Sequence, residues 1–205
     1  TDSGGKTLSE SFTVAITDAN DAPTLTVPTG GSVTEDAATS TITGSLVGSD
    51  PEDNSLTYSI DDVTASSGSY SLAGTYGTLV LNATTGAYTY TLDNSATATN
   101  ALAAGGSETE TFSVKVSDGT NITAAQNLSF TINGANDAPS SIALDSTSVV
   151  ENSAGAIVGA LSGSDAEGTS VIYSVVDSGD GTLFEIDGSN NLKLKTASAD
   201  YETKP

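Results

Sequence analysis

The acidic string Ala-Asn-Asp-Ala-Pro occurs twice in the chain, at residues 19–23 and again at residues 135–139. Each copy follows a segment in which apolar and polar residues alternate, residues 11–17 and residues 128–133. That alternation is the pattern of a half-buried β-strand. A fixed connector after two similar strands indicates a tandem repeat. The interval between the copies suits one β-sandwich domain, which typically has about 100 residues.

The segments after each connector also correspond, in the same order. The matched pairs are residues 33–36 and 149–152, 42–46 and 157–161, 48–52 and 163–167, and 56–60 and 171–175. We expect short strands in these segments, with Tyr58 and Tyr173 packed in equivalent cores.

The first repeat then continues with signals that the second does not share. Residues 78–81 and 88–92 alternate around a turn at residues 82–86, which predicts a hairpin. Residues 94–107 predict a loop with room for one short helical turn. Further strands are expected at residues 111–116 and 124–132. The predicted fold class is therefore all-β, a linear array of Ig-like antiparallel β-sandwiches with about seven strands each.

These patterns divide the chain into three parts. We expect residues 1–22 to be the C-terminal tail of a preceding repeat, with a last strand at residues 8–17. Residues 23–139 form a complete sandwich, and residues 140–205 form a sandwich that lacks its last two strands. One hypothesis is that the strand at residues 8–17 completes the unfinished sandwich of another molecule.

The charge of the chain restricts its partners. Asp and Glu number 26, Lys and Arg only 5, and the net charge is −21. Such a charge repels nucleic acids and anionic membranes. No apolar stretch approaches the roughly 20 residues of a membrane-spanning helix. Solubility in a salty medium is the simpler explanation for the acids, and the apolar fraction of 36% leaves disorder to be weighed against the clear strand patterns.

The available metal ligands are almost all oxygens. The chain has no Cys and no His, so disulfides are excluded and zinc, copper and haem lose their usual ligands. Carboxylate and amide oxygens are the ligands of calcium. In an extended connector alternate side chains share a side, so Asp18 and Asn20 are expected to face one ion, with Asp21 beside them.

The order of these motifs resembles two related families. Residues 23–137 resemble a VCBS repeat through Thr34-Glu35-Asp36, the Gly48–Glu52 and Gly74–Leu79 segments, and Ser117-Asp118-Gly119. Residues 1–22 and 138–205 resemble partial bacterial cadherin-like repeats, the latter through Val150-Glu151-Asn152, Asp165-Ala166-Glu167 and Asp200-Tyr201-Glu202. The resemblance implies a secreted protein of the bacterial cell surface, as in large RTX-type adhesins. It also implies cadherin-like sandwiches with Ca²⁺ at the junctions between them.

The resemblance also implies which residues hold calcium. At the first junction the following domain would add Asp50, Glu52 and Asp118 to the connector. At the second, Glu35, with Asp36 beside it, would act with Asn136, Asp137, Asp165 and Glu167. Glu151, Asp200 and Glu202 would serve a third junction, and Asp2 belongs to the turn of the first partial repeat. Because Gly134 stands where Asp18 stood, fewer ions are expected at the second junction. Asp61, Asp62, Asp177 and Asp180 are expected to be ordinary loop acids.

Three functions are compatible with these features. The first is a structural spacer in which calcium stiffens a string of domains, so that the partners are neighbouring repeats of the same chain. The second is a calcium-dependent module that binds carbohydrate, protein or another copy of the chain. Exposed tyrosines near a calcium site would favour this function. The third, a hydrolase with paired carboxylates, is disfavoured because the acids are expected at domain ends rather than around one pocket. We therefore expect a spacer rather than an enzyme.

Overall fold

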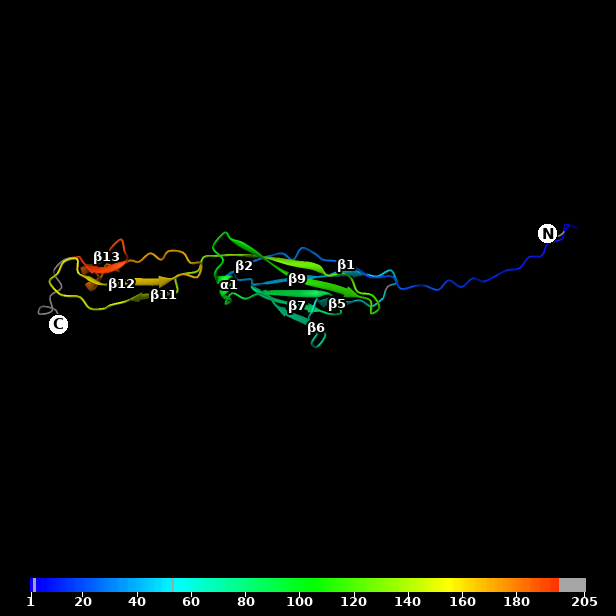
Figure 1. Cartoon of the computed structure of the whole chain (residues 1–205), viewed down its shortest axis with the longest axis horizontal. Coiled ribbons are helices and arrows are strands. Elements are labelled where there is room, and N and C mark those ends of the chain that lie inside the picture. The colour runs from blue at the N-terminus through cyan, green and yellow to red at the C-terminus, as the bar shows by residue number, and fades with distance from the viewer. Residues whose placement is uncertain (2, 53, 196–205) are drawn as a thin grey trace.

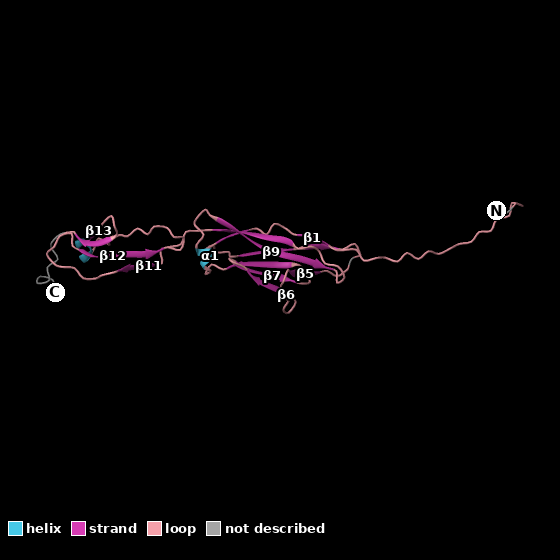
Figure 2. Cartoon of the chain, viewed as in Figure 1, coloured by secondary structure: helices cyan, strands magenta, loops and turns pink. Residues whose placement is uncertain are grey.

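Three parts follow one another along the long axis of the molecule in the computed structural model (Figure 1). An extended N-terminal segment leads into a β-sandwich, and a smaller β unit follows (Figure 2). The structure describes residue 1, residues 3–52 and residues 54–195. The predicted site residues Asp2, Asp200 and Glu202 lie outside the described residues. No helix in the described part of the chain has the length and apolar character needed to cross a membrane.

The sandwich consists of two four-stranded sheets and one short strand pair. The first sheet has the order β2-β10-β9-β5, namely Ser32–Thr34, Gln126–Asn133, Ser107–Ser117 and Thr57–Ile60. The second has the order β3-β8-β7-β6, namely Thr41–Ser45, Ala87–Leu92, Gly77–Asn82 and Ser69–Ala73. The pair is β1 (Thr24–Thr26) with β4 (Val47–Ser49). All pairings are antiparallel except β2 with β10, which is parallel. The prediction of an all-β antiparallel sandwich is thus confirmed, with more short strands than the expected seven.

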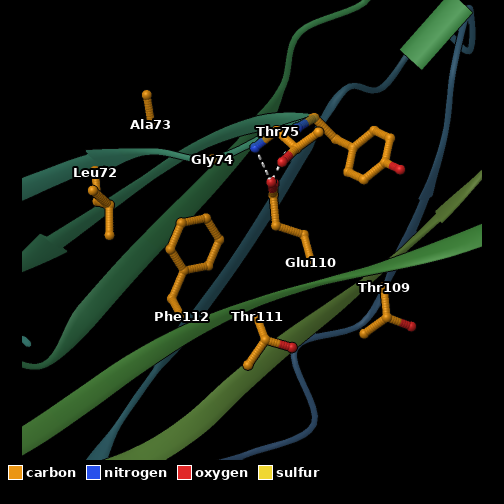
Figure 3. A pocket seen from close by; sticks show the side chains of 9 residues that line it. Leu72, Ala73, Gly74, Thr75, Thr109, Glu110, Thr111 and Phe112 are labelled. Atoms are coloured by element: carbon orange, nitrogen blue, oxygen red, sulfur yellow. Dashed lines mark hydrogen bonds between the residues drawn. The ribbon is translucent and has the colours of Figure 1, made fainter. Parts of the chain in front are cut away.

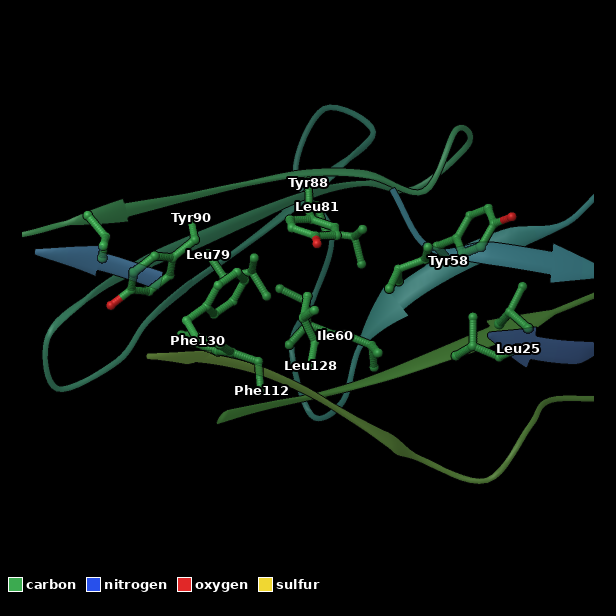
Figure 4. Close-up of a cluster of buried hydrophobic side chains, with 14 of the residues drawn as sticks. Leu25, Tyr58, Ile60, Leu79, Leu81, Tyr88, Tyr90, Phe112, Leu128 and Phe130 are labelled. Carbon is green, nitrogen blue, oxygen red and sulfur yellow. The ribbon is translucent and has the colours of Figure 1, made fainter. Parts of the chain in front are cut away.

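The core lies between the two sheets, because the alternating strands turn their apolar faces inward. Phe130 stacks on Tyr90 with ring centroids 4.4 Å apart, and Tyr88 meets Phe130 edge-on. Leucine and valine side chains fill the remaining space (Figure 4). Complete burial of one such side chain stabilises the fold by about 1.5–3 kcal/mol. Tyr58 is 7% exposed and belongs to this core, as predicted.

Local signals in the sandwich were predicted well. Strands β7 and β8 form the expected hairpin, and Asn82 Oδ1 accepts the backbone N–H groups of Thr84 and Thr85 in its turn. The loop at 94–107 contains the single helical turn α1 (Thr97–Asn100). Asp36 and Asn152 both have a positive φ, 55° and 56°, a conformation that Asp and Asn tolerate better than most residues. The equivalence of the segments at 33–36 and 149–152 therefore extends to the backbone.

The smaller unit has one sheet, β11-β12-β14-β13, namely Ser141–Leu144, Ile157–Ser164, Asn191–Leu194 and Phe184–Ile186. A 3-10 helix, η1 (Gly179–Leu183), precedes β13. The strand predicted at residues 171–175 is wrong: this segment is unpaired, Tyr173 is only half-buried and Ile172 is 93% exposed. In the sandwich the equivalent β5 is held by β9, and the described residues of the smaller unit include no counterpart of β9. The segment at 149–150 is also unpaired, whereas its counterpart β2 pairs with β10.

The N-terminal segment also departs from the prediction. The strand expected within residues 8–17 is not formed, and Phe12, Val14 and Ile16 are 86%, 79% and 93% exposed. The alternation was read correctly as a pattern, but a strand needs a partner for its backbone hydrogen bonds and its apolar face. None of the described strands pairs with this segment.

Candidate cation sites at the two connectors

The two connectors make the same contacts with the segment that follows them. The backbone N–H of Asp21 donates to Glu52 Oε2 at 3.2 Å, and that of Asp137 donates to Glu167 Oε1 at 2.5 Å. Within each connector the Asn side chain donates to the carbonyl of the next residue. The distance is 2.7 Å from Asn20 Nδ2 to the Asp21 carbonyl and 2.7 Å from Asn136 Nδ2 to the Asp137 carbonyl. Glu52 and Glu167 follow β4 and β12, which place the acidic turn beside the connector. The repeat read from the sequence is therefore a repeat of structure.

Asn20 is the centre of the first cluster. Its Nδ2 donates to Asp118 Oδ2 at 2.8 Å, and its Oδ1 accepts from Asn54 Nδ2 at 3.1 Å. Asn121 Nδ2 donates to the carbonyl of Asp21 at 3.3 Å. The turn after β9 and the loop after β4 thus both reach the connector, although they are distant in sequence. The hydrogen bond from Asn20 lowers the pKa of Asp118, with help from backbone N–H groups of the same turn.

Asp50 contributes a buried carboxylate to this cluster. It is 7% exposed, and its Oδ1 accepts the backbone N–H groups of Glu52 and Asn54, each at 3.1 Å. Its Oδ2 is buried and has no hydrogen-bond donor among the described residues. A buried charged oxygen without a partner is unfavourable by several kcal/mol. A cation at this oxygen would remove that cost.

Glu35 fixes the start of the second connector. It is 3% exposed and directly follows β2. Its backbone N–H donates to the carbonyl of Asn133 at 3.0 Å, and its Oε1 accepts the backbone N–H of Ala135 at 2.7 Å. Burial raises the pKa of Glu35, and the negative charges of Asp137, Asp36 and Glu167 raise it further. The side chain therefore lies among other acids.

Those other acids also face one another. Burial raises the pKa of Asp137, and the charges of Asp36 and Glu167 add to the effect. Asp137 Oδ2 and Glu167 Oε2 are buried without a hydrogen-bond donor among the described residues. Asp165 differs, because hydrogen bonds from Thr169 lower its pKa. Carboxylates gathered in this way repel unless protons or a cation neutralise them.

Two lysines pair with acids elsewhere in the molecule. Within the described residues, Lys115 pairs with Asp61 at 2.5 Å and Lys193 pairs with Glu185 at 3.1 Å, both away from the connectors. No three Asp, Glu, His or Cys side chains of the described residues already converge as a finished metal site. Several of these carboxylates accept backbone N–H groups, among them Glu35, Asp50 and Glu167. The donor set, carboxylate and amide oxygens with unused lone pairs, fits a hard divalent cation.

Not every predicted site residue joins these clusters. Asp18 is exposed, and its only hydrogen bond among the described residues is with the adjacent backbone N–H of Ala19. Glu151 is half-buried and lies beside Asn152, whose side chain donates to it at 3.4 Å. Conversely, the sequence analysis missed Asn54 and Asn121, which hold the connector through their amides. Their position beside Asp50-Pro51-Glu52 and Asp118 was the signal that could have identified them.

Glu110 is a buried carboxylate that the sequence analysis also missed. It lines a pocket of about 450 Å³ at the edge of the sandwich (Figure 3). It accepts the backbone N–H groups of Thr75 and Tyr76 and the hydroxyl of Tyr90, the last at 2.7 Å. It lies on the same side of β9 as Phe112 and Val114, so the period of two already pointed it inward. With its donors in place, Glu110 ties the turn between β6 and β7 to the opposite sheet.

Comparison with known proteins agrees with the fold. The model of the bacterial cadherin-like domain matches residues 20–134, the stretch in which the sequence resembles a VCBS repeat. No curated protein matches the chain in sequence.

Similar solved structures include two protocadherin fragments. One is protocadherin gamma B7 extracellular cadherin domains 1–4, with 21% identity and a TM-score of 0.52 over 92% of this chain and 44% of that one. The other is the protocadherin gamma B4 extracellular domain, with 17% identity and a TM-score of 0.51 over 93% of this chain and 29% of that one. The chain thus spans less than half the length of these structures, and at such identities the likeness concerns the fold.

Proposed function

The chain belongs to the bacterial cadherin-like domain family, and from that premise we propose that it is a calcium-stiffened stalk segment of a secreted bacterial surface adhesin. Domains of this family are adhesion or structural modules of extracellular proteins. In this role the segment positions distal adhesive domains away from the cell. The resemblance to VCBS repeats supports the further proposal that the whole protein is a large RTX-type adhesin.

One observation carries the proposal. Three buried carboxylate oxygens have no hydrogen-bond donor among the described residues, and all three lie at the connectors. They are Asp50 Oδ2 at the first connector and Asp137 Oδ2 and Glu167 Oε2 at the second. Calcium takes about 6–8 oxygen ligands at roughly 2.3–2.6 Å. Because these three oxygens have no hydrogen-bond donor among the described residues, we propose them as the primary ligands of the ion.

We assign the remaining ligands from the two clusters. At the first connector they are Asn20, Asp21, Glu52 and Asp118, with Asp18 as an additional exposed acid. At the second they are Glu35, Asp36, Asn136 and Asp165. Glu151, Asp200 and Glu202 would belong to a further junction, and Asp2 to the turn before the first connector. The ion would supply positive charge between domains, while the protein residues hold the connector in one direction.

The stiffening follows from linkage. Carboxylates from two domains and the connector repel one another when the ion is absent, and they share it when it is present. An ion that binds only the ordered junction stabilises it by about 2.7 kcal/mol when its concentration is 100 times the dissociation constant. Extracellular calcium modules bind at about 10⁻⁴–10⁻³ M, so the stalk would be stiff outside the cell.

Binding of sugar or protein by the segment itself has less support. A binding face of that kind would present tyrosines beside a cation site, but Tyr58, Tyr88 and Tyr90 are buried in the core. A reproducible calcium-dependent signal on a glycan array would favour this alternative over a passive spacer.

Isothermal titration calorimetry with calcium, with magnesium as the matched ion, tests the proposal directly. We expect calcium to give a binding isotherm and, in a separate thermal scan, to raise the melting temperature. Magnesium, which demands about six ligands at 2.0–2.1 Å, is expected to show no binding and no rise in melting temperature at the same concentration. Absence of calcium binding at millimolar concentration would refute the proposal.

A further inference from the structure

The backbone of the second connector is held by three different parts of the molecule. Gly134 N–H donates to the carbonyl of Gly106 at 3.0 Å. Ala135 N–H donates to Glu35 at 2.7 Å, and Asp137 N–H donates to Glu167 at 2.5 Å. The last two contacts use acids that we assign to the cation site. The first uses only backbone, and it comes from the loop that contains α1.

Gly134 approaches that loop so closely that no other residue fits. A Cβ atom at this position would lie 2.2 Å from the carbonyl oxygen of Leu102 and 2.4 Å from that of Ala103. The loop itself is anchored, because Leu102 packs against the hydrophobic core and its N–H donates to the carbonyl of Thr99 at 3.0 Å. Gly106 closes the loop with a hydrogen bond to Ala103 at 2.8 Å. The start of the connector is therefore packed against an anchored loop.

The first connector has no equivalent contact among the described residues. Asp18 occupies the place of Gly134, and Ala19 N–H donates back to Asp18 at 3.1 Å. What both connectors share is the hydrogen bond from Asp21 or Asp137 to the following acid. Among the described residues, the contact with α1 and its loop belongs to the second connector.

We infer that residues 97–106 form a brace that fixes the direction of the second connector without calcium. The brace takes the role that we assign to the acidic side chain of Asp18, which stands at the corresponding position of the first connector. The inference rests on the proposed function in one respect, namely that the connector is a hinge whose stiffness matters. It goes beyond that function because the second hinge would keep part of its stiffness when calcium is absent.

Distance measurements across the second connector test the inference. The chain has no Cys, so spin labels can be placed at S45C in the sandwich and S189C in the smaller unit, both exposed positions. Pulsed electron–electron double resonance then reports the width of the distribution of distances between the two spin labels, in chelator and in calcium. The test variant is G134A, and the matched control is G188A, because a Cβ at Gly188 meets nothing within 4 Å.

We expect the unmodified chain and G188A to give a narrow distribution in chelator, and G134A to give one about twofold broader. Equal widths for G134A and the unmodified chain in chelator would overturn the brace, whether both are narrow or both are broad. If G134A fails to fold, as judged by near-ultraviolet circular dichroism of the core tyrosines, L102A replaces it and the same two outcomes apply.

Calcium separates this inference from the proposed function. If calcium narrows the distribution of G134A, both stand. If G134A is broad and calcium leaves it broad, the brace stands and calcium stiffening of this junction fails. If the unmodified chain is broad in chelator and narrow in calcium, calcium stiffening stands and the brace is overturned.

Discussion

The two connectors share one five-residue string and differ in what precedes it. From Asn onward they share two contacts, the Asn side chain to the next carbonyl and the Asp N–H to a Glu of the following segment. Before the string, Asp18 is exposed at the first connector, whereas Gly134 is pressed against the loop of α1 at the second. The comparison teaches that the string brings the following acidic turn to each connector, and that Gly134 lets the loop of α1 reach the second one.

The largest effect that would sharpen this comparison is expected from Glu35→Ala. It leaves the partly buried N–H of Ala135 without an acceptor, which costs about 1–3 kcal/mol, and it removes a proposed calcium ligand. Glu35→Gln keeps an acceptor and removes the charge, so it should lose the calcium increment but little else. Urea unfolding in chelator and in calcium measures both. Asp62→Asn is the control, an exposed loop acid; if Glu35→Ala costs no more than this change, Glu35 does not hold the connector.

Exchanging the residues before the string is the next test. Gly134→Asp restores the acid of the first connector, but its Cβ would meet two carbonyl oxygens at 2.2 and 2.4 Å. We expect a loss of about 1–3 kcal/mol from the strain and no gain in calcium affinity. The reciprocal Asp18→Gly should change the free energy of unfolding by less than about 0.5 kcal/mol. A Gly134→Asp protein that binds calcium more tightly than the original would break the comparison.

Asp50→Asn tests the first connector alone. The amide oxygen can still accept the N–H groups of Glu52 and Asn54 and the buried negative charge is removed, so the melting temperature in chelator should not fall. In calcium the lost charge should weaken binding about tenfold, which is about 1.4 kcal/mol. Calorimetric titration of the variant gives the affinity. An unchanged affinity would remove Asp50 from the site.

The smallest expected effect is on the pH dependence in chelator. Burial raises the pKa of Glu35 above its ordinary value of 4.5, so the folded protein binds this proton more tightly than the unfolded chain. The free energy of unfolding should therefore rise as the pH falls through the raised pKa, and the gain should be complete below 4.5. Asp165 and Asp118, whose pKa values are lowered, act in the opposite direction at lower pH. Melting curves of Glu35→Gln should lack the part of the gain that Glu35 contributes and keep the part from Asp137, whose pKa is also raised, and calcium should abolish both in the unmodified chain.

Much of the sandwich was predictable because its information is local. Alternation predicted β7, β8, β9 and β10, and Asn82 marked the hairpin turn. The wrong predictions share one cause: residues 11–17 and 171–175 have the alternation of strands but no partner strand in the described residues. A pattern in one segment cannot say whether its partner is there.

The candidate sites were predictable in part for the same reason. The repeated string pointed to Asn20, Asp21, Asn136 and Asp137, and the family resemblance to Asp50 and Glu52. That these residues hold calcium stays a prediction. The contact of Gly134 with Leu102 and Ala103 depends on how a loop folds back over the end of β10. Gly134 was read as a missing ligand, and its role in close packing became visible only in three dimensions.

Small-angle X-ray scattering of the whole chain, first in calcium and then after chelation, tests the central claim most directly. The account predicts that chelation shortens the maximum dimension by less than a freely hinged chain would show, because the brace keeps part of the stiffness of the second connector, and that magnesium does not reverse the change. A maximum dimension that is the same in calcium and in chelator would contradict it.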